Sequence, residues 1–151
     1  MKDSFDLIVI GSGPGGYVAA IRAAQLGLKT ACIDKRKEPG GTCLHVGCIP
    51  SKSLLSSSEL VWKMRDTNVA NGITLAQPSI DFTPMMTRKT QTIQSFGQGI
   101  TSLFKKHKIS FYVGEASFLS STEILVKNAS ETTQLQARFI LIATGSEPIE
   151  L

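Results

Sequence analysis

The chain has 151 residues, of which 42% are apolar and 19% charged, and this is the size and composition of one soluble globular domain with one core. Its formal charge of +4 is modest, and its basic residues are scattered, so we expect no nucleic-acid partner. No apolar stretch approaches the roughly 18 residues of a membrane-spanning helix, so we expect no membrane association.

Cysteine usage indicates the cellular compartment. The chain has three cysteines, an odd number that does not suggest a secreted disulfide framework. Cys32 lies in an apolar run and is expected to be a small buried hydrophobe. The sequence passes from Met1 almost directly into a strand pattern, so we expect no signal or transit peptide. These features predict a cytoplasmic protein.

A βαβ unit is predicted at the start of the chain. Residues 5–10 form a short apolar run typical of a parallel strand that is covered on both faces. An alanine-rich helix is predicted over 15–26, and a second strand over 30–34. The connection between the two strands should be right-handed.

The remainder of the chain continues the alternation of helices and strands. In order, the patterns predict a helix over 50–65, a surface loop over 66–78, a helix over 82–106, a strand over 109–113, a hairpin from 117–119 and 123–127 with its turn at 120–122, and a buried strand over 139–143. The predicted fold class is therefore α/β, with a parallel sheet and a hairpin added to it.

The run 11–16 reads Gly-Ser-Gly-Pro-Gly-Gly and fits the pattern G-x-G-x-x-G between a strand and a helix. Gly11 would form the tight turn, Gly13 would let a pyrophosphate approach the backbone, and Gly16 would let helix and strand pack closely. Asp34 ends the second strand, where it is placed to bind ribose hydroxyls. The alternative is a glycine turn without a ligand, and the motif does not decide between FAD and NAD.

Cys43 and Cys48 form a C-x4-C pair with glycines on both sides. In a regular helix their Cα atoms would lie roughly 9 Å apart, whereas a disulfide needs a separation within about 7 Å. The backbone must therefore depart from a regular helix, and Gly47 can relieve the strain. A loop this short stabilises by only roughly 2 kcal/mol, against about 4.7 for a hundred residues, which favours redox cycling over a structural staple.

A redox pair needs a two-electron partner, and a flavin can accept electrons from a thiolate. Cys48 stands just before Pro50 at an expected helix start, where the pKa of a thiol is lowered. Cys43 is expected in an open loop, where an external thiol could attack it. We therefore expect Cys43 to exchange with substrate and Cys48 to face the flavin.

The segment has two other interpretations. His45 could complete a metal site with the two cysteines, but no fourth ligand is apparent and the spacing is unusual for zinc, so no metal is expected. The two cysteines could also be structural buried thiols. His45 itself is expected to be an exposed loop residue.

With these motifs, and with the runs 99–109 and 143–146, the chain resembles the N-terminal part of the dihydrolipoyl dehydrogenase family of FAD-dependent pyridine nucleotide-disulfide oxidoreductases. The resemblance covers essentially the whole chain. It implies a three-layer, Rossmann-like FAD-binding domain, incomplete here, with a parallel sheet and a β-hairpin or meander. The runs 49–52 and 100–109 favour the lipoamide branch over glutathione or mercuric-ion reductases.

The resemblance also implies particular site residues. Cys43 and Cys48 would form the catalytic redox disulfide. The FAD-binding positions would be Gly11, Gly13, Gly16, Asp34, Gly41, Thr42, Cys43, Lys52, Ala116, Thr144, Gly145 and Ser146. Asp34 stands where the family more often has Glu, and His45 stands where it usually has Asn.

The implied activity is oxidation of protein-bound dihydrolipoamide, with electrons passing through the cysteine pair and FAD to NAD. The implied partners are the lipoyl domains of 2-oxo-acid dehydrogenase complexes and a second copy of the protein, in a homodimer. Residues 1–151 would be the N-terminal portion of the FAD-binding domain, without NAD-binding, central and dimerisation domains, so this chain alone should be inactive. The alternatives are a relative acting on glutathione or another small disulfide, and a non-catalytic dinucleotide-binding module.

Overall fold

The computed structural model of the chain describes residues 3–66, 72 and 79–150. Its elements are β1 (Asp3–Ile10), α1 (Pro14–Gln25), β2 (Thr30–Asp34), α2 (Gly41–His45), α3 (Cys48–Asp66), α4 (Phe82–Lys106), β3 (Ser110–Val113), β4 (Glu115–Phe118), β5 (Glu123–Lys127) and β6 (Thr132–Ile142). Apart from its first residue and Gly72, the loop predicted over 66–78 lies outside the described residues.

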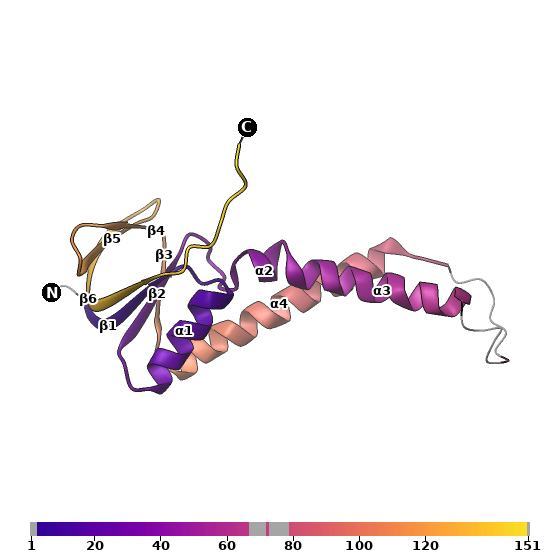
Figure 1. Cartoon of the computed structure of the whole chain (residues 1–151), viewed down its shortest axis with the longest axis horizontal. Coiled ribbons are helices and arrows are strands. Elements are labelled where there is room, and N and C mark those ends of the chain that lie inside the picture. Colours follow the sequence, from indigo (N-terminus) through magenta and orange to yellow (C-terminus); the bar gives the residue numbers. More distant parts are fainter. Residues whose placement is uncertain (1–2, 67–71, 73–78, 151) are drawn as a thin grey trace.

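The described strands form one mixed sheet in the order β3-β2-β1-β6-β5-β4 (Figure 1). The pairs β1–β2, β2–β3 and β1–β6 are parallel, whereas β5 pairs antiparallel with both β6 and β4. The predicted α/β class, with a parallel sheet and an added hairpin, is therefore confirmed.

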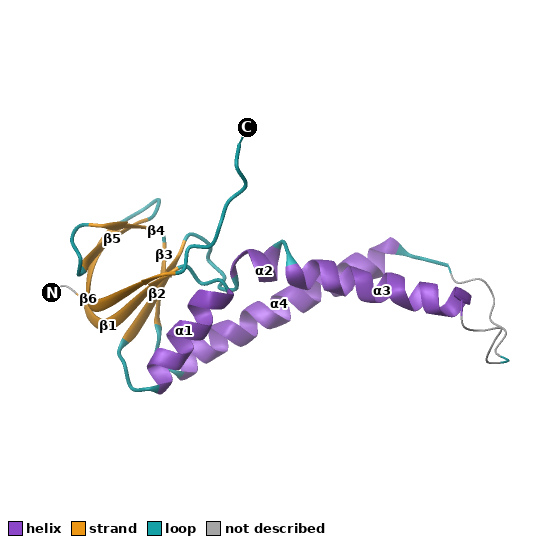
Figure 2. Cartoon of the chain, viewed as in Figure 1, coloured by secondary structure: helices purple, strands orange, loops and turns teal. Residues whose placement is uncertain are grey.

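The core lies on both faces of the parallel strands, because successive side chains of a strand point to opposite faces. On one face Val9 and Cys32 pack with Ala20 of α1 and Phe104 of α4. On the other face the parallel strands pack with Ile124 and Val126 of β5 and with Leu135 and Ala137 of β6. The helices, the parallel strands and the antiparallel meander of β4, β5 and β6 thus form three layers (Figure 2).

The helices α3 and α4 pack along each other and extend away from the sheet (Figure 1). The side chain of Asp81 caps α4 by accepting a hydrogen bond from the Thr83 N–H at 2.9 Å. Lys105 and Lys106 occupy the last turn of α4, where positive charge complements the helix dipole. None of the described helices is long and apolar enough to cross a membrane.

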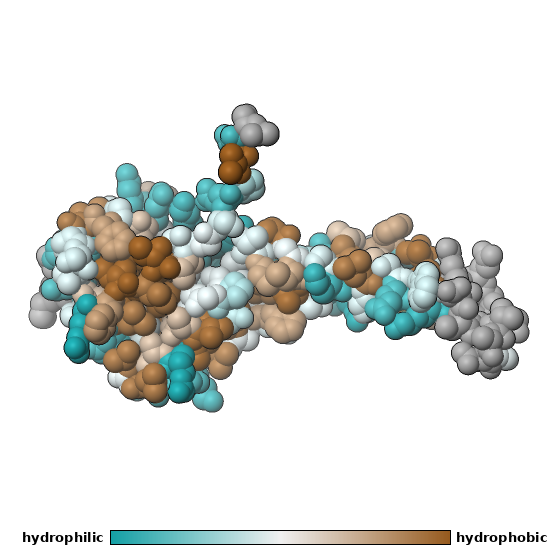
Figure 3. Space-filling view, in the orientation of Figure 1, coloured by the Kyte–Doolittle hydropathy of each residue, from teal (hydrophilic) through white to brown (hydrophobic). Residues whose placement is uncertain are grey.

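Three predictions about helices and strands need correction. The short helix α2 was not predicted, because Gly40 and Gly41 are poor helix formers. β6 is a strand as predicted, but it begins at Thr132 and not at residue 139. Its first half was not predicted because buried and exposed residues alternate there and no apolar run marks it. Its apolar end is also not buried: Phe139 and Ile142 are 55% and 63% exposed. Figure 3 shows apolar surface over the sheet on the face in view.

Candidate functional site

The predicted nucleotide-binding residues meet at one edge of the sheet. Ile10, at the end of β1, pairs with Ile33 of β2 on one side and with Ile142 of β6 on the other. Because these three strands are parallel, the loops that begin at Gly11 and Ala143 leave the sheet side by side. The Ala143 N–H donates to the Ile10 carbonyl at 2.8 Å.

Two glycines of the turn, Gly11 and Gly16, have no space for a side chain. Gly11 has a φ of +101°, and a Cβ built on it would overlap the carbonyl oxygen of Ala143. A Cβ on Gly16 would overlap the carbonyl oxygen of Gly11, which confirms that this glycine permits close packing of helix on strand. Gly13 is the N-cap of α1 and provides no side-chain cap. The first N–H groups of α1 therefore suit a phosphate, and the turn fits a pyrophosphate.

Asp34 is held beside this turn by hydrogen bonds from the chain. Its Oδ2 accepts from the Ser12 N–H at 2.7 Å and from the Ser12 hydroxyl at 2.6 Å. Its Oδ1 accepts from the Arg36 N–H at 2.9 Å. A carboxylate has about four acceptor positions, so one remains for a ribose hydroxyl. Ribose binding by Asp34 stays a prediction.

The segment with the cysteines packs directly on the glycine turn. The Gly40 N–H donates to the Ser12 carbonyl at 2.9 Å. Gly41 has a φ of +62°, and a Cβ on it would lie 2.5 Å from the Cα of Gly13. These two glycines turn the chain into α2, which carries Thr42 and Cys43. The predicted dinucleotide turn and the predicted redox pair are therefore adjacent in space.

The backbone between the cysteines departs from a regular helix, as their spacing predicts. α2 ends at His45, its C-cap residue Val46 has a φ of −136°, and α3 begins at Cys48. A Cβ on Gly47 would lie 3.2 Å from the Thr42 carbonyl oxygen. Gly47 therefore provides room at the break, while Val46 takes up the change of direction.

Cys43 and Cys48 are both free cysteines, and their side chains are near enough to interact. The pKa of the Cys43 thiol is raised, mainly by its hydrogen bond with Cys48 and then by burial, while the charge of Lys52 opposes the shift. Cys48 is the first residue of α3, which begins two residues earlier than the helix predicted over 50–65. The expected open loop around Cys43 is wrong: Cys43 is half-buried within α2, and Cys48 is the more exposed of the two.

The third cysteine and the histidine of this segment have other surroundings. Cys32 is fully buried, and burial, followed by the charge of Asp34, raises its pKa to about 12, so its expected role as a buried hydrophobe is confirmed. His45 is not an exposed loop residue, because it ends α2, half-buried, with its Nε2 3.2 Å from the Glu38 carbonyl oxygen. Within the described residues, no three His, Cys, Asp or Glu side chains are grouped to hold a metal.

The other predicted cofactor positions lie around the same edge. Ala116 is in β4, just after Gly114, whose N–H donates to the Asp34 carbonyl at 2.8 Å. Residues 144–146 follow β6 and are exposed, with Gly145 at a φ of +77°. Lys52 lies on α3, within electrostatic reach of Cys43. Contacts of these residues with FAD stay predictions.

Ser12 was not among the predicted site residues, although it bonds to Asp34. The available signal was a hydroxyl inside the glycine turn of a βαβ unit. In such a unit this turn lies beside the end of the second strand.

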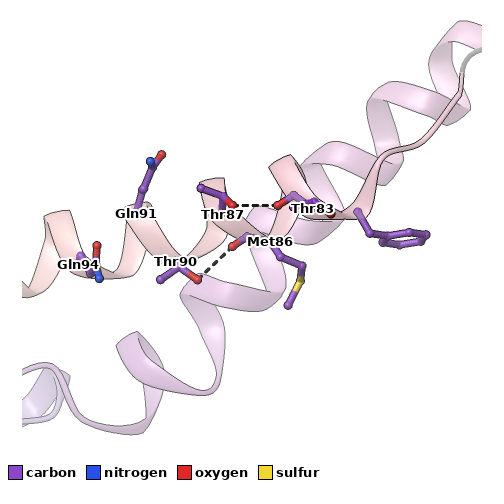
Figure 4. A pocket seen from close by; sticks show the side chains of 7 residues that line it. Thr83, Met86, Thr87, Thr90, Gln91 and Gln94 are labelled. Carbon is purple, nitrogen blue, oxygen red and sulfur yellow. Dashed lines mark hydrogen bonds between the residues drawn. The ribbon is translucent and has the colours of Figure 1, made fainter.

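A hollow of about 610 Å³ lies apart from this site, along the first half of α4. Figure 4 shows the Thr87 and Thr90 hydroxyls bonded back to the carbonyls of Thr83 and Met86 on the same helix, at 2.9 and 3.0 Å. These hydroxyls are satisfied within the helix and define no ligand.

The glycine turn packed against a cysteine pair is the arrangement of a flavin-dependent disulfide oxidoreductase. The sequence model of the pyridine nucleotide-disulphide oxidoreductase family matches residues 5–151, and the chain belongs to this family. Membership implies FAD and NAD as cofactors, with the FAD-binding domain in this segment.

Individual relatives give the same result. The chain is 46% identical over 147 residues to the mitochondrial dihydrolipoyl dehydrogenase of Pisum sativum, and 47% identical over 148 residues to the dihydrolipoyl dehydrogenase of Chlamydia muridarum (strain MoPn / Nigg). It is 46% identical over 147 residues to the leghemoglobin reductase of Vigna unguiculata. These alignments cover 97%, 98% and 97% of the chain, but only 29%, 31% and 28% of the respective relatives.

Proposed function

We propose that this chain belongs to a flavoprotein that oxidises protein-bound dihydrolipoamide to lipoamide and passes the electron pair to NAD+. The main support is the direct packing of the cysteine segment on the glycine turn. Gly41 lies against Gly13, and the Gly40 N–H donates a hydrogen bond to the Ser12 carbonyl. The names of the dihydrolipoyl dehydrogenase relatives support the choice of substrate.

In the proposed reaction the oxidised protein contains a Cys43–Cys48 disulfide. One substrate thiolate attacks the Cys43 sulfur, and Cys48 leaves as a thiolate. The second substrate thiolate then attacks the substrate sulfur bound to Cys43, which forms the lipoyl disulfide and releases Cys43 as a thiolate. FAD, when bound, supplies an acceptor for the electron pair.

The positions of the two cysteines support this division of roles. Cys48 begins α3, and a helix N-terminus stabilises the thiolate that leaves. The pKa of Cys43 responds first to the Cys48 side chain, so the two side chains are near enough to interact. Lys52 adds a positive charge that favours the thiolate form of Cys43.

The proposal extends to the whole protein. We assign residues 1–151 to the N-terminal portion of an FAD-binding domain, which alone would not turn over, and the NAD-binding, central and dimerisation domains to a longer protein. The support is that the chain spans less than a third of the relatives that it matches. We also propose that the full-length protein is a homodimer, that it acts on lipoyl domains, and that it is cytoplasmic.

The first test is the visible spectrum of the flavin in the full-length protein. Two-electron reduction should produce a long-wavelength absorbance band. Cys48→Ser should abolish this band and retain FAD, whereas the matched control Cys32→Ala should keep both. A band that persists in Cys48→Ser would refute the assigned role of Cys48.

A substrate panel and a thiol count separate the alternatives. A preference for glutathione or another small disulfide over dihydrolipoamide would replace the proposed substrate. For a redox pair, two fewer free thiols should appear in the oxidised protein than in the reduced protein. An equal number in both states would indicate a dinucleotide-binding module with structural thiols.

A further inference from the structure

Ser12 is the point at which three segments of the site meet. Its side chain is 0% exposed and lies in the turn between β1 and α1. Its N–H and its hydroxyl both donate to Asp34, and its carbonyl accepts from Gly40. One buried residue thus contacts the end of β2 and the entrance to the cysteine segment.

The hydroxyl bond is of the strong, charge-assisted kind. Its length of 2.6 Å lies in the range of about 2.5–2.7 Å that is found for hydroxyl donors to ionised carboxylates. Both Ser12 donors bind the same oxygen, Oδ2, and Arg36 binds the other oxygen. Together the three bonds fix the direction in which the carboxylate of Asp34 faces.

The length of the Asp34 side chain makes this orientation important. Aspartate is one methylene shorter than glutamate, so its carboxylate reaches less far from the end of β2. A short carboxylate has little freedom to correct its position relative to a ribose. The three hydrogen bonds hold this short carboxylate in place, and the Ser12 hydroxyl donates one of them.

We propose that Ser12 is a positioning residue for the nucleotide site: its hydroxyl orients the carboxylate of Asp34 toward the adenosine ribose of FAD. This inference rests on the proposed function, because it assumes that FAD occupies the glycine turn. The Ser12 side chain is fully buried. It acts through Asp34, which keeps about one free acceptor position.

The test is nucleotide affinity of the full-length apoprotein, measured separately with FAD and with ADP. ADP contains the adenosine ribose but no flavin. Loss of one hydrogen bond to a charged group should weaken binding about tenfold in Ser12→Ala, and by the same factor for both nucleotides. Ser12→Cys, which is close in size and donates weakly, should give a smaller loss and provides a second variant if Ser12→Ala does not fold.

Thr30→Val is the matched control. Thr30 is also buried, at 2% exposed, and its hydroxyl donates to the Leu28 carbonyl at 3.0 Å, at the opposite end of β2. Loss of this hydroxyl should lower the stability of the protein but leave both nucleotide affinities unchanged. A general loss of stability is thereby separated from an effect on the site.

A double-mutant cycle with Asp34→Ala gives the decisive comparison. Ser12→Ala should cost no further affinity when Asp34 is absent. Additive losses, unchanged ADP affinity in Ser12→Ala, or an equal loss in Thr30→Val would overturn the role of Ser12. If the wild-type protein binds no FAD, the proposed function fails as well, and this outcome is distinct from the others.

Discussion

At the carboxyl edge of the sheet, Gly11 and Gly16 leave no room for a Cβ, whereas Gly99 in α4 faces open space. The edge is built from backbone packed on backbone, and its donors and acceptors bond across segments that are distant in sequence. Along the first half of α4, the threonine hydroxyls instead bond within their own helix. Close packing of backbone on backbone, at Gly11 and Gly16, therefore distinguishes the carboxyl edge of the sheet from α4.

The largest effect is expected from Gly16→Ala. Its Cβ would overlap the Gly11 carbonyl oxygen, which is rigid backbone, so we expect a loss of about 3 kcal/mol in the free energy of unfolding and weakened FAD binding. Gly99→Ala is the matched control, and it should stabilise α4 by about 0.5–1 kcal/mol. Urea unfolding of the full-length protein measures both changes. Equal changes in the free energy of unfolding would show that the carboxyl edge of the sheet and α4 do not differ in packing.

A smaller effect is expected from Gly41→Ala. A left-handed conformation costs alanine about 1–2 kcal/mol, and here the new Cβ also meets Gly13. Gly27→Ala has a similar φ, +87°, but an open environment, so it should show the conformational cost alone. The same unfolding measurement compares them. If Gly27→Ala is as damaging as Gly41→Ala, close packing of the cysteine segment on the glycine turn contributes nothing.

A substitution at the N-cap of α4 tests the pair of helices α3 and α4, which extends away from the sheet. Asp81→Ala removes the acceptor for the Thr83 N–H and should cost about 1 kcal/mol of stability. Because the cap lies far along the chain from the glycine turn and bonds only locally, FAD affinity should not change. Asp81→Asn keeps an acceptor and is the control. A loss of FAD affinity in Asp81→Ala would contradict the separation of the two regions.

The reactivity of Cys43 gives a prediction in pH. Its raised pKa leaves less thiolate near neutral pH, so alkylation by iodoacetamide should accelerate only as the pH rises above the ordinary thiol range. Cys48→Ala removes the main cause of the shift and should speed alkylation of Cys43 at neutral pH. Mass spectrometry of the labelled peptides of the reduced protein measures this. Unchanged rates would show that Cys48 does not control the pKa of Cys43.

Cys32 provides the internal reference for that labelling. It is fully buried, and its pKa is about 12, so it should stay unlabelled while the protein is folded. Labelling of Cys32 would reveal unfolding and would invalidate the comparison between the other two cysteines.

The sequence predicted the elements whose signals are local. The strand over 30–34 and the helix over 82–106 have the predicted bounds, because apolar periodicity fixes them without distant contacts. The helix α2 was missed because Gly40 and Gly41 adopt positive φ values that only their packing explains. Glycine composition alone predicts an open loop there.

The assembly of the site was predictable in part. Spacing predicts the glycine turn and the C-x4-C pair, and the need of a redox pair for a flavin predicts that Cys48 faces the cofactor. The bond between Ser12 and Asp34 could not be predicted, because these residues meet only after β1 and β2 have paired. The exposed end of β6 was also missed, since an apolar run does not reveal which face of a sheet is covered.

The central claim is that Cys43 and Cys48 cycle between a disulfide and two thiols. Peptide mapping of the full-length protein, alkylated under denaturing conditions before and after anaerobic treatment with dihydrolipoamide, tests this directly. We predict that these two cysteines are linked and unlabelled before treatment and both labelled after it, while Cys32 is labelled in both samples. Labelling of Cys43 and Cys48 that does not change with dihydrolipoamide would contradict the claim.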